Sequence, residues 1–179
     1  MSTATAAEPL EALLDVPIRY VERSRAYYMS LGYDNPYRWA QNEEVPFAKL
    51  KKPLRESRVA IIGTAALFNP AVGDQGAWAA YNADAKFTDV YTVALDPAPD
   101  LRISHLGYDR KHTSAEDVNS YFPNVQMQAA AAEGRVGILH PEYYGVPTLR
   151  SQRLTAEHAE TLLGLLRRDK IDAAVMVAT

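Results

Sequence analysis

The chain contains no cysteine among its 179 residues. This absence excludes disulfide bonds, thiolate metal sites and a cysteine nucleophile within these residues. No apolar run reaches the roughly 20 residues that a membrane-spanning helix needs, and no basic segment followed by an apolar core marks a secretory signal. A formal net charge of −3 gives no general attraction to nucleic acid or to anionic membranes. We therefore expect a cytoplasmic protein that binds neither nucleic acid nor membranes.

The residues that are present have the balance of an ordinary globular domain. Hydrophobic residues make up 47% of the chain and charged residues 23%, which is typical of a domain with a packed core. We find no internal repeat and no low-complexity tract. Residues 1–57 are expected to form a lead-in, helical over 8–31 and extended over 32–57, where prolines and charges gather. Residues 58–179 are expected to form the main domain.

Segments typical of strands and of helices alternate over residues 58–179. The clearest strand is RVAIIGTAALF at 58–68, which is nearly all apolar and rich in β-branched residues. Further strands are expected over 89–95, 101–107, 136–140 and 171–179, and helices over 115–122, 125–134 and 155–170. This alternation predicts an α/β fold with a largely parallel sheet flanked by helices.

Local sequence also predicts how these elements pack and where they end. The segments 59–62, 136–139 and 174–177 are apolar on both faces, which predicts interior strands covered by helices. Gly134 is expected to end the second helix, and Thr155 is expected to cap the third. His158, within the third helix, is interpreted as a surface histidine.

The densest polar segment of the chain is SHLGYDRKHTSAEDVNSYFP at 104–123. Its histidine and carboxylate side chains follow a predicted strand, where His105 and Asp109 could act as acid, base or substrate clamp. His105, Asp109 and His112 also have the chemistry of metal ligands, but their spacing requires a helix and Gly107 argues against one. We therefore predict no metal site.

Helix capping is the alternative explanation of the same segment. Thr113 or Ser114, followed by Glu116 or Asp117, forms a capping-box pattern in which side chains bind the free backbone groups of a helix start. Spacing alone leaves both explanations open.

The segment HPEYYG at 140–145 is expected to follow the strand over 136–140. It offers His140, Glu142 and Tyr144, which are side chains able to bind a substrate. A packed aromatic turn is the alternative, and the sequence leaves the two open.

The order of these motifs resembles the glycine/sarcosine/betaine/D-proline reductase selenoprotein B family, and most closely its D-proline reductase branch. The family shows Ser-His-x-Gly-Tyr-Asp, here at 104–109, then Asp-x-Asn-x-x-Phe-Pro, here at 117–123, then a Tyr-Gly turn, here at 144–145. The likeness covers about residues 58–179. A glycine-rich loop of D-proline reductase is replaced here by VPTLRSQR at 146–153. The resemblance therefore does not determine the identity of the substrate.

In this family a selenocysteine or cysteine follows the strand that corresponds to residues 172–179, and a second cysteine comes a few positions later. The resemblance therefore implies a redox residue immediately after Thr179, which the present residues do not include. It follows that these 179 residues alone are expected to be inactive. A UGA codon for selenocysteine, proteolytic processing and a natural terminus would each account for the chain end.

The resemblance further implies a reductase component that cleaves a C–N or related bond of a small amino-acid-like substrate. A dithiol donor would supply electrons, a partner reductase subunit would carry a pyruvoyl group, and this chain would hold no cofactor of its own. The implied catalytic residues are His105 and Asp109. The implied substrate-binding residues are Tyr108, Asp117, Asn119, Phe122, His140 and Tyr144.

Two other functions compete with the reductase. One is a non-catalytic subunit that binds a small molecule or a partner protein. The other is a cofactor-independent enzyme that uses acid–base chemistry at His105 and His140. The sequence leaves open whether the protein forms a homo-oligomer.

Overall fold

The computed structural model describes residues 19–32, 43–46, 48–75, 83–85, 87–103, 116–147 and 152–177. The chain divides into two compact units, residues 1–41 and residues 42–179. In the first unit, helix α2 (Tyr20–Ser30) confirms part of the helical spacing expected over 8–31. Within the described ranges, no helix has both the length and the apolar character to cross a membrane.

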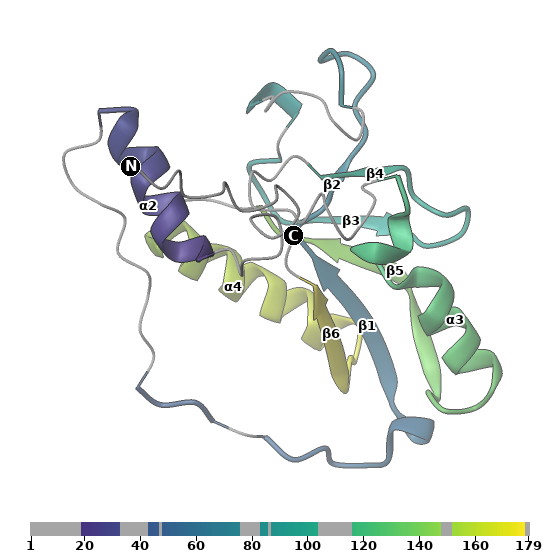
Figure 1. The fold of residues 1–179 in the computed structure, drawn as a ribbon. Coiled ribbons are helices and arrows are strands. Elements are labelled where there is room, and N and C mark those ends of the chain that lie inside the picture. The colour runs from purple at the N-terminus through teal and green to yellow at the C-terminus, as the bar shows by residue number, and fades with distance from the viewer. Residues whose placement is uncertain are drawn as a thin grey trace, which may run out of the picture. The chain divides into compact units, whose positions relative to one another are not determined.

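A four-stranded sheet organises the second unit, with the strand order β3-β5-β1-β6 (Figure 1). Its strands are β1 (Arg58–Gly63), β3 (Tyr91–Ala94), β5 (Ile138–Gly145) and β6 (Ala173–Val177). β1 pairs in parallel with both β5 and β6, whereas β3 runs antiparallel to β5. The predicted α/β fold with a largely parallel sheet is therefore confirmed.

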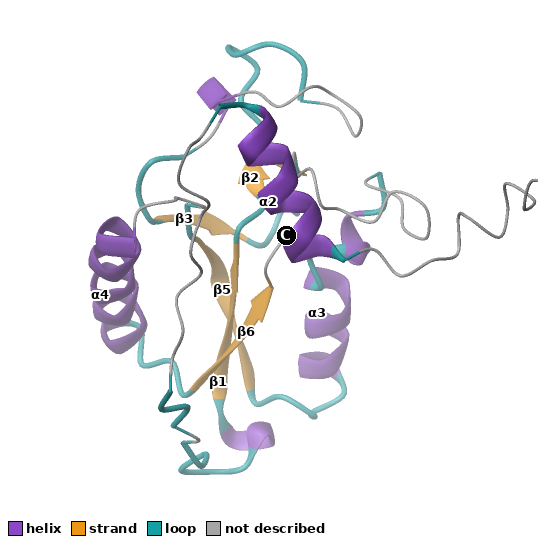
Figure 2. Ribbon diagram, turned by 60° about the vertical axis from the view of Figure 1, so that its left-hand side comes forward, coloured by secondary structure: helices purple, strands orange, loops and turns teal. Residues whose placement is uncertain are grey.

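Helices cover the two faces of this sheet (Figure 2). They are α3 (Asn124–Ala132) and α4 (Gln152–Arg168). On one face Val59 packs with Ala130 of α3, and on the other Ala60 and Ile62 pack with Leu162 of α4. Successive residues of a strand point to opposite faces, so β1 is buried on both. This two-sided burial is the reason why its sequence is apolar without alternation.

Short elements connect the strands and helices. They are η1 (Leu54–Glu56), β2 (Ala66–Leu67), η2 (Ala83–Ala85), β4 (Leu101–Arg102) and η3 (Val118–Ser120). β2 and β4 pair with each other as a separate antiparallel sheet. The strand expected over 101–107 is therefore seen as β4, and its remainder lies largely outside the described residues. The helix expected over 115–122 is, where described, the 3-10 turn η3.

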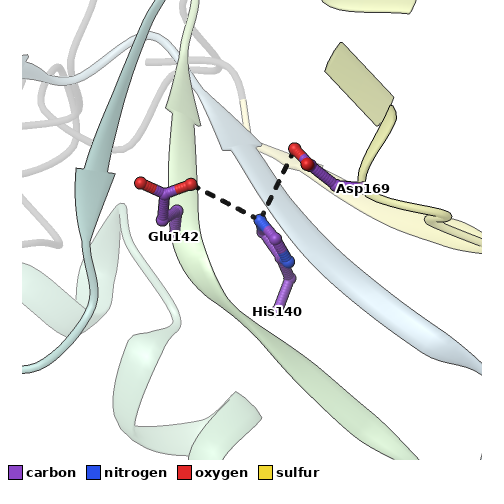
Figure 3. A group of neighbouring side chains, drawn as sticks. All are labelled: His140, Glu142 and Asp169. Carbon is purple, nitrogen blue, oxygen red and sulfur yellow. Dashed lines mark ion pairs between the residues drawn. The ribbon is translucent and has the colours of Figure 1, made fainter. Parts of the chain in front are cut away.

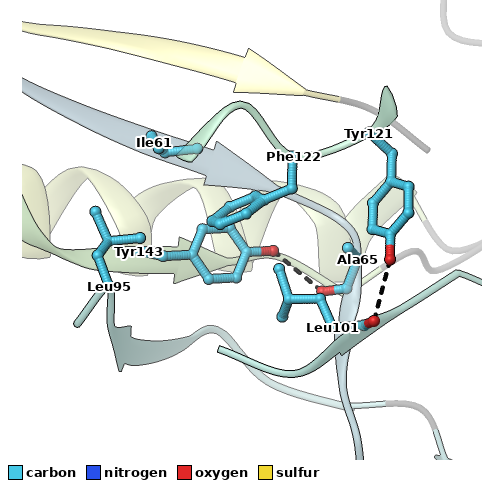
Figure 4. Packing of buried hydrophobic residues seen from close by; sticks show 7 residues of the cluster. All are labelled: Ile61, Ala65, Leu95, Leu101, Tyr121, Phe122 and Tyr143. Carbon is cyan, nitrogen blue, oxygen red and sulfur yellow. Dashed lines mark hydrogen bonds between the residues drawn. The ribbon is translucent and has the colours of Figure 1, made fainter. Parts of the chain in front are cut away.

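One core cluster joins β1 and β5 to the connecting segments (Figure 4). Its buried members are Ile61, Ala65, Leu95, Leu101, Tyr121, Phe122 and Tyr143. The ring of Phe122 meets the ring of Tyr143 edge to face, with 4.8 Å between the centroids. The hydroxyl of Tyr143 donates to the carbonyl of Ala65 at 3.1 Å, and that of Tyr121 donates to the carbonyl of Leu101 at 3.1 Å. Both tyrosines thus bury their rings with the hydroxyl satisfied.

β6 is an edge strand, so the prediction that 174–177 is an interior strand is wrong. In the described sheet β1 is its only partner. Ala173 and Val175 pack toward the α3 side, whereas Ala174 is exposed and Met176 is 74% exposed. An apolar sequence pattern indicates which residues can be buried. It does not indicate whether a strand pairs with one neighbouring strand or with two.

The interior position predicted for 59–62 in β1 is confirmed. For 136–139 it is only partly correct, because β5 begins at Ile138, which is 51% exposed, and β3 pairs with β5 only from Glu142 onward.

The two predicted helix ends have different outcomes. Gly134, with φ of +71°, follows α3 and donates its N–H to the carbonyl of Ala131, which confirms it as the helix stop. Thr155 lies inside α4, which begins at Gln152, so its prediction as the cap is wrong. The preceding Gln-Arg-Leu are good helix formers and extend the helix toward the N-terminus.

Candidate functional site

An irregularity in β5 gathers the polar residues of the candidate site. The pairing of β1 with β5 steps from Val59–Leu139 to Ile61–Tyr143. Residues 140–142 of β5 therefore stand opposite a single residue of β1. A bulge of this kind bends a strand and re-aims its side chains, and it accommodates a proline, which has no N–H to donate. The prediction that HPEYYG follows the strand is wrong, because β5 runs through it.

His140, Glu142 and Asp169 meet beside β5 (Figure 3). The Nε2 atom of His140 lies 3.8 Å from Oε2 of Glu142 and 3.8 Å from Oδ2 of Asp169. His140 and Glu142 are two residues apart in the strand and share a face. Asp169 comes from the turn between α4 and β6, so the cluster joins segments distant in sequence.

Asp169 is held by two neighbours. Arg168 donates from Nε to Oδ1 at 2.8 Å and from its terminal nitrogen to Oδ2 at 2.8 Å. The hydroxyl of Tyr144 donates to Oδ2 at 2.6 Å. These hydrogen bonds, from Arg168 first and then from Tyr144, hold the pKa of Asp169 well below its usual range. Burial, together with the Asp169 carboxylate, raises the pKa of Tyr144, so this hydroxyl remains a donor.

His140 is buried, with 6% of its surface exposed. Its ring stacks on Tyr144, with centroids 5.4 Å apart and an interplanar angle of 3°. Neither ring nitrogen makes a hydrogen bond with the described residues. Burial lowers the pKa of His140 below its ordinary value, against the opposing influence of the Asp169 and Glu142 carboxylates. The ring is therefore neutral at neutral pH, and its Nε2 faces two anionic groups.

A second buried histidine corrects the sequence interpretation. His158 is 8% exposed, and its Nε2 lies 3.9 Å from Oδ1 of Asp89. It is therefore not a surface histidine. The reason is helical spacing: Leu154, His158 and Leu162 recur every four residues on the apolar face of α4.

Asp117 and Asn119 form a local turn. Oδ1 of Asp117 accepts from the backbone N–H of Asn119 at 3.0 Å and from its side-chain amide at 3.1 Å. Asp117 is thereby the cap of η3. In the predicted capping box it was instead the downstream partner of a cap at Thr113 or Ser114, which lie outside the described residues. Phe122, 1% exposed, is packed in the core cluster. The roles of Asp117, Asn119 and Phe122 in substrate binding stay predictions.

The structure brings some predicted site residues together and separates others. His140 and Tyr144 stack on each other, and Tyr144 packs with Leu162 of α4. Phe122 packs on Tyr143. Tyr143 directly precedes Tyr144 in β5, so its side chain points to the opposite face of the sheet. His105, Tyr108 and Asp109 lie outside the described residues, as do His112, Thr113, Ser114 and Thr179.

Sequence reasoning missed the contribution of Asp169 and Arg168. From the sequence, the basic residues near the end of α4 are sufficiently explained by the helix dipole, which favours positive charge at that end. Nothing in the local sequence signals that Asp169 contacts a histidine in β5. The signal that was available is the histidine two residues before Glu142, a pattern that puts both on one face if the segment is a strand.

Comparison of the chain with family models, with curated proteins and with solved structures finds no match. The family resemblance therefore rests on the sequence motifs alone.

Proposed function

We propose that the chain is a component of a selenol- or thiol-dependent reductase that cleaves a C–N or related bond of a small amino-acid-like substrate. The observation that carries this proposal is the parallel pairing of β6 with β1 over the whole of β6. The carboxyl ends of the two strands consequently lie at one edge of the sheet. In open α/β sheets this is the edge at which ligands bind, and it is where the resemblance expects the redox residue.

The end of β6 is closely fitted against β1. Gly63 pairs with Val177, and a Cβ atom at Gly63 would lie 3.2 Å from the carbonyl oxygen of Val177. Just beyond, the carbonyl of Ala65 accepts from the hydroxyl of Tyr91 at 2.7 Å and from that of Tyr143 at 3.1 Å. Burial raises the pKa of both tyrosines, so both hydroxyls remain donors. These contacts support a rigid edge, suited to positioning a residue that follows β6.

The motif segment of the resemblance is anchored to the same core cluster. Tyr121 and Phe122 belong to that cluster together with Ala65 and Leu101. The described flanks of the segment 104–115, which carries the predicted catalytic residues His105 and Asp109, therefore both reach it. This arrangement supports a role of the motif segment at the carboxyl edge of β1.

The proposed chemistry divides between this chain and its partners. A selenocysteine or cysteine after β6 would supply the nucleophile, and a pyruvoyl group on a partner subunit would activate the substrate. In the net reaction a C–N bond is replaced by a C–H and an N–H bond, and a dithiol donor is oxidised to a disulfide. His105, Asp109, Asp117 and Asn119 would orient the substrate or deliver the proton to the leaving nitrogen. A cytoplasmic location would keep such thiols reduced.

The coding sequence beyond the Thr179 codon tests this proposal directly. We expect an in-frame UGA or cysteine codon, followed a few codons later by a cysteine codon. An ordinary stop codon, or an open frame without cysteine or selenocysteine near the junction, would contradict the proposal. That result would favour the non-catalytic binding subunit instead.

A further inference from the structure

We propose that His140, Glu142 and Asp169 form a binding site for a divalent transition-metal ion of the Zn²⁺ type. One ligand atom from each of the three side chains lies within 4.8 Å of the other two (Figure 3). The site shares His140 with the substrate-binding set that the family resemblance implies. Its test measures metal binding and not reductase activity, so the outcomes of the two proposals can be distinguished.

The unsatisfied ring of His140 is the observation that points to a ligand. Buried polar atoms are normally hydrogen-bonded, and leaving one unpaired costs about 1–3 kcal/mol. Both nitrogens of His140 are buried without a hydrogen bond, and Nε2 lies 3.8 Å from a carboxylate oxygen on either side. This separation is too long for a hydrogen bond. It is the arrangement expected where a shared cation would neutralise the two carboxylates and accept the lone pair.

Two of the three spacings between ligand atoms need little adjustment. Zinc binds histidine nitrogen and carboxylate oxygen at about 2.0–2.2 Å, and two ligand atoms at the tetrahedral angle are then about 3.4 Å apart. The two separations of 3.8 Å between His140 and the carboxylates close to this value by a few tenths of an ångström. The oxygens of Glu142 and Asp169 lie within 4.8 Å of each other, and this separation has to shorten when an ion binds. The irregularity in β5 orients the side chains of His140 and Glu142 toward the turn that carries Asp169.

The donor set indicates the class of ion. Imidazole suits zinc, copper, iron and nickel, whereas magnesium and calcium prefer oxygen ligands alone. The two carboxylates balance the charge of a divalent ion.

The existing contacts of Asp169 are compatible with metal binding. The hydroxyl of Tyr144 donates to Oδ2, as an outer-shell group does when it orients a ligating carboxylate. The side chain of Arg168 is 59% exposed. Its terminal nitrogen can therefore give up the hydrogen bond to Oδ2 of Asp169, while its Nε keeps the hydrogen bond to Oδ1. The positive charge of Arg168 opposes a cation, which predicts that Arg168→Gln tightens binding.

Isothermal titration of the untagged 179-residue chain with Zn²⁺ tests this site, with the visible spectrum of bound Co²⁺ as a second readout. We expect one ion per chain, and an affinity at least about tenfold weaker in Glu142→Gln and in Asp169→Asn. Asp89→Asn is the matched control: it removes the same charge beside the other buried histidine, and it should leave the affinity unchanged.

Glu142→Gln decides the outcome even if a substitution of Asp169 prevents folding. The side chain of Glu142 is 41% exposed and is not buried in the core, so the variant is expected to fold, which circular dichroism checks. Binding that is absent in the wild type would overturn the proposal. Binding that Glu142→Gln leaves unchanged would overturn it equally, because the ion would then be bound elsewhere.

Discussion

Helices α3 and α4 end in the same backbone motif, with different residues in its left-handed position. After α4, the N–H of Lys170 donates to the carbonyl of Arg167 at 3.2 Å and that of Ile171 to the carbonyl of Leu166 at 2.9 Å, which is the Schellman arrangement. Lys170 has φ of +56°, where α3 has Gly134 with φ of +71°. A side chain in this region costs about 1 kcal/mol. The turn that follows Asp169 is therefore strained.

This difference predicts opposite effects of two substitutions. Lys170→Gly should stabilise the protein by about 0.5–1 kcal/mol, because glycine adopts positive φ without a steric penalty. Gly134→Ala should destabilise it by about 1 kcal/mol, and the loss is a backbone effect because no atom lies within 4 Å of an added Cβ there. Urea unfolding followed by circular dichroism measures both. A destabilised Lys170→Gly variant would show that the lysine side chain contributes more than its strained backbone costs.

At the scale of single residues, the sequence predicts what side-chain type alone determines. Gly134 was recognisable as a helix stop because glycine prevails at that position. Lys170 was not, because lysine seldom adopts positive φ. Asp169 was not recognisable as a site residue, because its role depends on a contact with His140, which lies far away in the sequence.

The packing of β3 on β5 depends on a glycine in a strand. Tyr91 pairs with Gly145, and a Cβ atom built on Gly145 would lie 1.9 Å from Cζ of Tyr91. The ring of Tyr91 also stacks on Phe87, with centroids 4.1 Å apart. The aromatic ring therefore occupies the space that a side chain at 145 would need, and it cannot move without losing its stacking.

Replacement of two glycines by alanine tests this packing. Gly145→Ala should destabilise the protein by about 1–3 kcal/mol through overpacking. Gly164→Ala is the matched control within helix α4, where nothing lies within 4 Å of an added Cβ, and it should stabilise by about 0.5–1 kcal/mol. Thermal unfolding of both variants gives the comparison. Equal stability of Gly145→Ala and the wild type would show that Tyr91 does not pack over the glycine as described.

At the scale of elements, existence and type were better predicted than extent. α4 and β1 have long regular patterns, and both were found near their predicted positions. The strand over 136–140 was predicted to end at His140, and the proline that follows is a residue that usually interrupts strands. The irregular pairing of β5 with β1 accommodates this proline, so the strand continues beyond it. Strand register depends on two paired strands, so it could not be predicted from the sequence of one of them.

For the molecule as a whole, alternation of strands and helices was sufficient to predict the α/β class. The order of strands was not predictable, because it depends on which apolar surfaces meet in the folded state. The site shows the same limit. Sequence placed His140, Tyr144 and Phe122 in one substrate-binding set, whereas alternation along β5 directs His140 and Tyr144 to the face opposite that of Phe122.

The reductase proposal makes a specific prediction about thiol reactivity at the carboxyl edge of β1 and β6. The 179 residues have no group that carries two electrons, so by themselves they should show no dithiol-dependent reductase activity. We predict that a cysteine at the first redox position after Thr179 has a pKa below about 8.5, the value of an unperturbed thiol, as a nucleophile active at neutral pH requires.

Alkylation with iodoacetamide at neutral pH tests this claim most directly, on the chain extended through the codons after Thr179 with cysteine at the first redox position. The matched control carries serine there. We predict rapid labelling of the cysteine form at that position, slowed by small amino-acid-like substrates, and none in the serine form. Labelling no faster than that of an unperturbed thiol, or substrate turnover by the 179-residue chain alone, would contradict the reductase proposal.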